Sequence, residues 1–275
     1  MNRSPKRRLA TQIAIILAAF LGWNALMGGA LLLLPRVYAI LAAALLFAWF
    51  LRAFVLRSGR PGERRRWALL RIRPLGRGAA RATLASIPVL FALSWSVGEL
   101  WVRLVPVPPE TLQPFRQLTG DPLGRLSVTL VAVVAAPLLE ELVFRGMIQH
   151  PLERRWGPGR AIALTSLVFA AFHFLPWVLP VHLVLGLAFG YAVYATRSIW
   201  AGVALHAANN SMAALALGAE TPELPPTIWR TGITSEFWTA LAVLAAAAVA
   251  ARHAAEWLWR AGHAARLAER GRRTS

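Results

Sequence analysis

The stretch that decides the fold runs over residues 126–149 and reads LSVTLVAVVAAPLLEELVFRGMIQ. It is long enough to cross a bilayer, because a membrane-spanning helix needs about 20 predominantly apolar residues. Yet it contains Glu140, Glu141 and Arg145, and an ionisable side chain at the bilayer centre costs about 3 kcal/mol on insertion scales. The stretch therefore predicts a membrane helix whose charged residues serve a function.

The composition extends this prediction to the whole chain. Of its 275 residues 57% are hydrophobic and only 15% are charged, whereas soluble domains carry about 25% charged residues. The apolar residues form long blocks, which indicates lipid as the solvent, so we expect an all-α, polytopic transmembrane helix bundle of about eight spans. The predicted spans lie near residues 10–34, 37–56, 82–104, 126–149, 161–178, 180–196, 199–217 and 234–252.

Lysine and arginine are distributed as the positive-inside rule requires. A net charge of +18 in a soluble protein would suggest nucleic-acid binding. Here the cations lie between apolar blocks, so we expect anionic lipid headgroups as partners and no nucleic acid. Both termini are predicted to be cytoplasmic, and most cations then face the cytoplasm. The exceptions are Arg36, Arg103, Arg116, Arg125, Arg230 and, within a span, Arg145.

Two segments outside the central spans carry further predictions. The first block is too long for the apolar region of a signal peptide and no clear cleavage site follows, so we expect a retained span. The basic residues 57–78 are predicted to form a short helix on the headgroups, with Trp67, Leu69, Leu70 and Ile72 as its apolar contacts.

The two adjacent glutamates are expected to differ in role. Glu141 and Arg145 are four residues apart, so on a helix they share a face and can pair. Glu140 points about 100° away and is left without that partner. A structural salt bridge at a helix end is the alternative interpretation, but such a bridge would need only one glutamate.

Two further blocks carry polar residues at membrane depth. One contains Phe169 and His173, and the other contains His206 and Asn210, which lie one turn apart. Counted from the cytoplasmic ends, Glu140 and His173 lie about 18 Å deep and His206 about 12 Å. Polar groups from three helices at similar depth predict a water-filled cavity between these helices that opens towards the cytoplasm.

A purely structural role of these residues stays open as an alternative. A lone histidine on a helix often serves packing or hydrogen bonding, and adjacent asparagines can hold helices together. Glu99 and His182 lie near the ends of blocks, so we expect them at the interface, and His150 follows the fourth block into the cytoplasm; all three are expected outside the site.

The order Glu-Glu-x-x-x-Arg, Phe-x-x-x-His and His-x-x-x-Asn resembles the CPBP family of intramembrane proteases, which includes type II CAAX prenyl endopeptidases and bacterial Abi-type immunity proteins. The resemblance covers roughly residues 125–215. It implies an eight-helix bundle and hydrolysis of a peptide bond in a membrane-associated peptide or protein, by CAAX-type processing or on another target.

The resemblance also divides the chain and suggests its location. We expect N-terminal transmembrane helices with a basic cytoplasmic loop in 1–124, a catalytic core in 125–218, and a last span with a basic tail in 219–275. Lys6 is the only lysine, and this arginine-rich composition favours a multi-pass protein of a bacterial inner membrane.

The residues favour a water nucleophile. The chain has no cysteine and no Gly-x-Ser-x-Gly elbow, which argues against covalent catalysis. Glu140 and His173 would activate the water, Glu141 would pair with Arg145, and His206 and Asn210 would stabilise the oxyanion.

A metal-dependent version stays open beside it. Glu140, His173 and His206 could bind zinc and leave a position for water. No His-Glu-x-x-His helix is present, and the residues do not decide between the two versions.

Two functions of other classes are the alternatives. A catalytically silent membrane scaffold, or a bacteriocin-immunity partner, could use the same cavity for binding. A glutamate-coupled transporter usually shows two related halves, and the sequence shows none.

Overall fold

A computed structural model describes residues 5–34, 36–50, 52, 70–218 and 225–274, and all regular elements in these ranges are helical. The helices before the central stretch are α1 (Pro5–Leu33), α2 (Arg36–Phe50), α4 (Arg77–Ala85), α5 (Ile87–Leu104), η2 (Pro109–Leu112) and α6 (Gln113–Thr119). The central stretch comprises α7 (Pro122–Leu130), η3 (Val131–Ala135), α8 (Ala136–Glu140), η4 (Glu141–Gln149) and α9 (His150–Trp156). The remaining helices are α10 (Pro158–Ala171), η5 (Pro176–Val178), α11 (Leu179–Thr196), α12 (Ile199–Gly218), α13 (Ile228–Thr231) and α14 (Ser235–Thr274).

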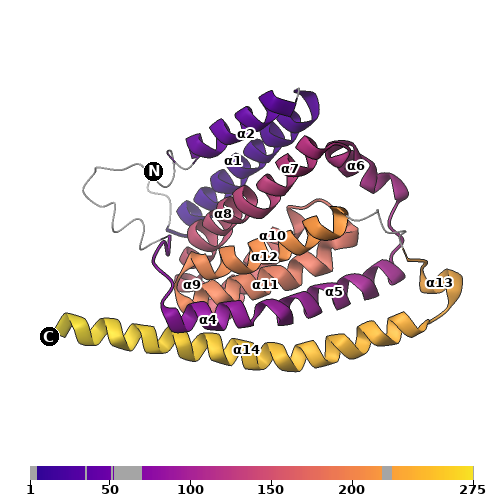
Figure 1. Ribbon diagram of the computed structural model, residues 1–275. Coiled ribbons are helices and arrows are strands. Elements are labelled where there is room, and N and C mark those ends of the chain that lie inside the picture. Colours follow the sequence, from indigo (N-terminus) through magenta and orange to yellow (C-terminus); the bar gives the residue numbers. More distant parts are fainter. Residues whose placement is uncertain (1–4, 35, 51, 53–69, 219–224, 275) are drawn as a thin grey trace.

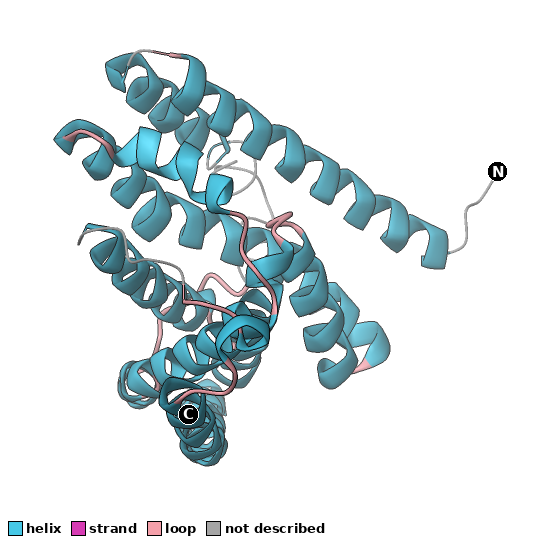
Figure 2. Cartoon of the chain, turned by 90° about the vertical axis from the view of Figure 1, so that its right-hand side faces the viewer, coloured by secondary structure: helices cyan, strands magenta, loops and turns pink. Residues whose placement is uncertain are grey.

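The helices form a bundle with α10, α11 and α12 in its middle (Figure 1). The hairpin of α1 and α2 covers one side, and α5 and α14 cover the opposite side, an arrangement that the perpendicular view repeats (Figure 2). Helix α11 packs against α10, α12, α5 and α14. Residues on the inner faces of α11 and α12, such as Phe189 and His206, are therefore buried, and a polar group there must find its partners within the protein.

The fold class predicted from the sequence is confirmed. Among the described residues, five helices are long and apolar enough to cross a membrane. They cover Leu9–Ala30, Arg77–Leu104, Pro122–Trp156, Pro176–Thr196 and Ser235–Ala268. Parts of the blocks expected at 37–56, 161–178 and 199–217 are also helical, in α2, α10 and α12. Eight spans stays a prediction, because α2 has only 15 residues and α10 only 14.

The central stretch is one long helix that twice widens into a π-helix, in η3 and in η4. Pro137 supplies a reason for the first widening, because its ring has no N–H and clashes with the carbonyl four residues earlier. The N–H of Ala136 bonds instead to the carbonyl of Val131. The carbonyl of Ala132 is thereby left for a partner outside the helix.

The basic loop differs from its prediction. Residues 57–69 of the predicted interfacial helix lie outside the described residues, but Leu70 and Ile72 can be placed. Leu70 is buried against Gly146, and Ile72 packs against Leu142, Val193 and Ile199. The expectation that Leu70 and Ile72 contact headgroups is therefore wrong, because both side chains find apolar partners inside the protein.

The last helix is longer than predicted. The span expected at 234–252 is part of α14, which has 40 residues. At 1.5 Å per residue such a helix measures about 60 Å, twice the hydrocarbon thickness. The basic tail is thus a continuation of the same helix, and it extends past α4 at the arginine-rich end of the bundle (Figure 1).

Candidate functional site

The ion pair between Glu141 and Arg145 forms the floor of the candidate site. Oε1 of Glu141 lies 3.0 Å from Nη1 of Arg145, and both side chains are enclosed, with exposures of 0% and 1%. Arg145 also donates from Nη2 to the carbonyl of Gly186. The prediction that these two residues pair across one helical turn is confirmed.

Three aromatic rings surround the guanidinium of Arg145. Its Cζ lies 4.6 Å from the ring centre of Phe169, 5.5 Å from Phe189 and 5.9 Å from Phe144. A cation over aromatic faces is stabilised by the ring quadrupoles, most strongly where water is excluded. Arg145 is therefore fixed as a structural cation that holds the Glu141 carboxylate.

Glycine on α12 makes room for that carboxylate. A Cβ atom at Gly202 would collide with Oε2 of Glu141 and would lie 2.8 Å from Val193 Cγ2. Only a residue without a side chain lets α12 approach the carboxylate so closely. This contact brings α12, and with it His206, next to the glutamate pair.

Glu140 occupies a different environment from its neighbour. Its side chain is 16% exposed, and its buried Oε2 accepts no hydrogen bond from the described part of the chain. The nearest nitrogen is Nε2 of His206, 3.8 Å from that oxygen. Glu140 is thus the more accessible of the two carboxylates, and it lacks an arginine partner among the described residues, as its position on the helix predicted.

His206 lies between the two carboxylates. Its Nδ1 is 3.3 Å from Oε1 of Glu141, while its Nε2 faces Glu140. The ring stacks on Phe189 at a centroid distance of 4.7 Å and an angle of 20°. The carboxylate and the phenyl ring fix the plane of the imidazole, so its Nε2 keeps one direction.

His173 follows the end of α10 and is joined to this group through Phe169. The ring of Phe169 meets the imidazole of His173 at 5.0 Å and that of His206 at 5.8 Å. Nδ1 of His173 lies 2.9 Å from the carbonyl of Phe169. Since a carbonyl oxygen only accepts, Nδ1 carries the proton of the neutral ring and Nε2 keeps the lone pair.

The next residue has an unusual backbone. Phe174 adopts a φ of 54°, in the left-handed region that bulky residues rarely occupy. Such strain persists only where the surrounding structure enforces it, and it clusters at functional sites. Here it turns the chain sharply after His173.

His182 was placed outside the site from the sequence, and the structure corrects this. Its ring centre lies 3.6 Å from that of His173, and its Nδ1 lies 2.9 Å from the carbonyl of Val178. The turn between α10 and α11 brings the two histidines together. The signal in the sequence is the proline-containing turn at 176–180, which places one histidine on each side of a helical hairpin.

Asn210 anchors α12 to the widened helix. Its Nδ2 donates to the carbonyl of Ala132 at 2.8 Å, the group that Pro137 leaves without an intrahelical partner. Asn209 donates from Nδ2 to Oδ1 of Asn210. Asn210 thus links two helices, whereas Asn209 bonds within α12, and one N–H of Asn210 is left for another acceptor.

Gln149 was not recognised from the sequence. It is fully buried, and its Nε2 donates both to the carbonyl of Gly190 and to Oε1 of Glu153. Glu153 in turn pairs with Arg71. The spacing Arg145-x-x-x-Gln149 was the available signal, because both side chains bond to α11 carbonyls that are also four residues apart.

The excluded Glu99 stays outside the site. It forms its own pair with Arg103 on α5, at 2.7 Å. This pair has the same i, i+4 spacing as Glu141 and Arg145 but belongs to another helix, so it offers a matched control.

The proposed zinc ligands do not form a metal centre in this arrangement. The described residues contain no group of three histidine, aspartate or glutamate side chains placed to hold one metal ion. Glu140 and His206 face each other, while the ring of His173 packs on His182. Zinc binding by Glu140, His173 and His206 stays a prediction.

The arrangement provides three groups: the Glu140 carboxylate with an oxygen that accepts no hydrogen bond, His173 with a lone pair on Nε2, and His206, which the buried Glu141 carboxylate holds in place. These are the components of general acid–base chemistry on water. The predicted water-filled cavity stays a prediction.

Comparison with protein families connects this arrangement to known proteins. Residues 122–212 match the family model described as Type II CAAX prenyl endopeptidase Rce1-like. The matched segment contains all six predicted site residues, from Glu140 to Asn210. No curated protein and no solved structure gives a significant match.

Proposed function

Residues 122–212 belong to the CPBP family through their match to the type II CAAX prenyl endopeptidases, and from this premise we propose that the chain cleaves a peptide bond within the membrane by activating water at Glu140. The chain is a multi-pass membrane protein with several apolar helices. Its substrate is a membrane-associated peptide or protein, with CAAX-type processing as the first candidate.

The proposal rests on the different environments of two adjacent carboxylates, those of Glu140 and Glu141. Glu141 is enclosed with Arg145, while Glu140 is partly exposed and has an oxygen without a hydrogen bond. A purely structural bridge accounts for Glu141 alone. A second carboxylate at this depth, left unpaired by any arginine, fits a general base.

In the proposed reaction, Glu140 accepts a proton from water as the oxygen attacks the scissile carbonyl carbon. His173 accepts the second hydrogen bond of that water through the lone pair on Nε2 and so orients it. When the tetrahedral intermediate collapses, the C–N bond breaks and Glu140 passes the proton to the leaving amine. One water is consumed: its hydroxyl becomes part of a carboxylic acid group, and its other hydrogen becomes part of the amine.

His206 and Asn210 are proposed to stabilise the developing oxyanion. In its imidazolium form His206 donates from Nδ1 to Glu141 and retains Nε2–H for the intermediate. Asn210 retains one N–H beyond its bond to Ala132. Donors that are fixed before the reaction stabilise charge without reorganisation, and one such donor is worth about 100-fold to 1,000-fold in turnover.

Comparison of membrane peptides from wild-type and Glu140→Ala cells tests the function. The expected result is a peptide that persists only in the variant and that purified wild-type protein cleaves. Glu99→Ala is the control, because it removes a glutamate of α5 that pairs with Arg103 outside the candidate site. Identical peptides in the wild-type and Glu140→Ala cells would contradict the proposal.

A further inference from the structure

A second feature lies away from the candidate site, where α4 and α5 pack along α14. Four arginines surround a cavity of about 470 Å³. They are Arg73, Arg77, Arg197 and Arg266, and they come from the loop before α4, from α4, from the turn after α11 and from α14. None of the described residues that line this arginine pocket is acidic.

The walls of the arginine pocket are held in place by the backbone. Ser198 donates from its hydroxyl to the carbonyl of Arg73 at 2.7 Å, and Ile199 donates its N–H to the carbonyl of Arg71. Arg266 donates from Nη1 to the carbonyl of Ala195 and lies over the ring of Trp259. The loop, the turn and α14 are therefore joined, and the pocket exists before any ligand binds.

Two of the four arginines are available to bind a ligand. Arg77 and Arg197 are exposed and make no ion pair with the described part of the chain. Arg197 ends α11 in the left-handed conformation, with a φ of 57°, so the helix stops and its side chain stays at the rim. Guanidinium groups gathered around one cavity repel one another, and a bound anion relieves that repulsion.

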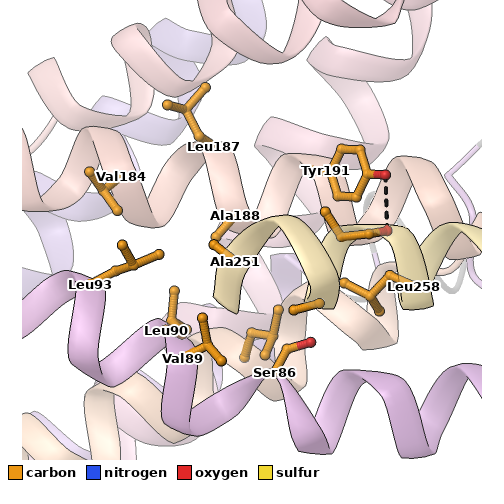
Figure 3. A pocket seen from close by; sticks show the side chains of 13 residues that line it. Ser86, Val89, Leu90, Leu93, Val184, Leu187, Ala188, Tyr191, Ala251 and Leu258 are labelled. Atoms are coloured by element: carbon orange, nitrogen blue, oxygen red, sulfur yellow. Dashed lines mark hydrogen bonds between the residues drawn. The ribbon is translucent and has the colours of Figure 1, made fainter. Parts of the chain in front are cut away.

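A second, apolar groove lies beside a neighbouring stretch of α14. It has a volume of about 300 Å³ and is lined by side chains of α5, α11 and α14, including Val89, Leu93, Leu187, Ala254 and Leu258 (Figure 3). The hydroxyl of Tyr191 donates to the carbonyl of Ala255 (Figure 3), so this polar group is satisfied.

The two cavities are consecutive on one helix. The groove uses α14 up to Leu258, and the arginine pocket begins at Ala261. Corresponding positions such as Ala254 and Ala261 are one seven-residue step apart, or about 10 Å along the axis. A cationic pocket next to an apolar groove on one helix matches an amphiphile with an anionic head and an acyl chain.

We propose that this composite site binds one anionic phospholipid, with its phosphate among the four arginines and an acyl chain in the groove of α5, α11 and α14. Arginine suits this role because its planar guanidinium bonds phosphate oxygens in pairs. The cations lie on the side that the positive-inside rule assigns to the cytoplasm. The occupant is therefore a lipid of the leaflet with the negative surface potential. The proposal is independent of the peptidase assignment.

The test counts lipids that stay bound to the purified full-length chain in native mass spectrometry. Phosphatidylglycerol and phosphatidylcholine are compared at equal concentration, and phosphatidylglycerol is expected to bind preferentially. The double variant Arg77→Gln/Arg197→Gln should weaken its binding about 25-fold, at about fivefold for each arginine near a membrane surface.

The matched control is Arg252→Gln/Arg260→Gln, which removes the same charge from α14. These arginines are 81% and 80% exposed and pair with Glu256 outside both cavities. The control should leave phosphatidylglycerol binding unchanged, and Arg77→Lys/Arg197→Lys should retain most of it. Equal losses in the two glutamine variants would show a diffuse surface charge and would overturn the proposal.

A further variant and a competition experiment distinguish a bound lipid from a bound free phosphate. Ala254→Phe fills the groove and should weaken phosphatidylglycerol binding, and inorganic phosphate should not displace the lipid. If phosphate competes fully and Ala254→Phe has no effect, the pocket is an anion site without an acyl chain. Thermal unfolding of each variant confirms that the fold is retained.

Discussion

The imidazole rings of His173 and His182 stack across the turn between α10 and α11, with centres 3.6 Å apart and planes at 39°. Each ring is held by the carbonyl four residues before it. His182 has no place in the three motifs of the sequence, yet it covers one face of a proposed water-orienting residue.

His182 is therefore expected to be a positioning residue. His182→Ala should lower turnover about 10-fold to 100-fold, because a small displacement of a positioned group has effects of this size. His182→Phe keeps a ring over His173 and should recover most of the activity. Measuring KM beside kcat separates positioning from substrate binding. A large rise in KM at unchanged kcat, or equal loss in both variants, would contradict the assignment.

Glu140 and His173 should be indispensable for cleavage. Glu140→Ala and His173→Ala should each reduce the rate by about 100-fold to 10,000-fold, the range of general acid–base catalysis. Insertion and thermal unfolding should stay near wild type, since neither side chain takes part in the enclosed ion pair. Glu99→Ala is the control and should keep its activity. Full activity of either variant would contradict the assignment of Glu140 and His173 to catalysis.

Glu140→Gln distinguishes the peptidase from a silent scaffold. The amide keeps the shape of the side chain but cannot accept the proton of water. A peptidase loses its cellular phenotype with this change, whereas a scaffold or immunity partner that uses the cavity for binding retains it. Complementation of a deletion strain with Glu140→Gln provides the measurement.

Glu141→Ala should lose both stability and activity. It leaves Arg145 buried without its counter-charge, and breaking a buried pair in this way costs about 3–5 kcal/mol. Glu256→Ala removes an exposed partner of Arg252, and such surface pairs contribute about 1 kcal/mol or less. Unfolding of both variants in one detergent gives the comparison. Equal small losses would show that the aromatic rings and the carbonyl of Gly186 stabilise Arg145 without Glu141.

Gly202 should not tolerate a methyl group. Gly202→Ala pushes a Cβ atom into Glu141 and towards Val193, and overpacking of this kind costs about 1–3 kcal/mol. The control is Gly159→Ala on α10, where a Cβ atom meets nothing within 4 Å and the helix should be stabilised by about 0.5–1 kcal/mol. Opposite shifts of the unfolding temperature are expected, and equal shifts would argue against a close contact at Gly202.

Metal dependence is decided by elemental analysis of the purified chain and by activity before and after chelation. Because the described residues hold no group of three ligands around one point, we expect activity to survive chelation. Loss of activity that stoichiometric zinc restores would instead mean that His173 leaves His182 and joins Glu140 and His206.

By itself, the sequence determined the helical membrane fold and the identity of the central polar residues. Long apolar blocks fix helices in lipid, because every backbone group must bond within its own segment. The four-residue spacing of Glu141 and Arg145 fixed their pairing, since that spacing returns to the same helical face. The three motifs could be found together because each interrupts an otherwise apolar block.

Only the tertiary structure decided how those residues meet. The stacking of His182 on His173 depends on a turn, and the approach of His206 depends on the missing side chain of Gly202. The bond between Asn210 and Ala132 depends on a carbonyl that a proline leaves free on another helix. These contacts join residues distant in sequence, and a periodic pattern carries information only about neighbours on one helix. The arginine pocket likewise exists only because the loop before α4, the start of α4 and the turn after α11 lie together beside α14.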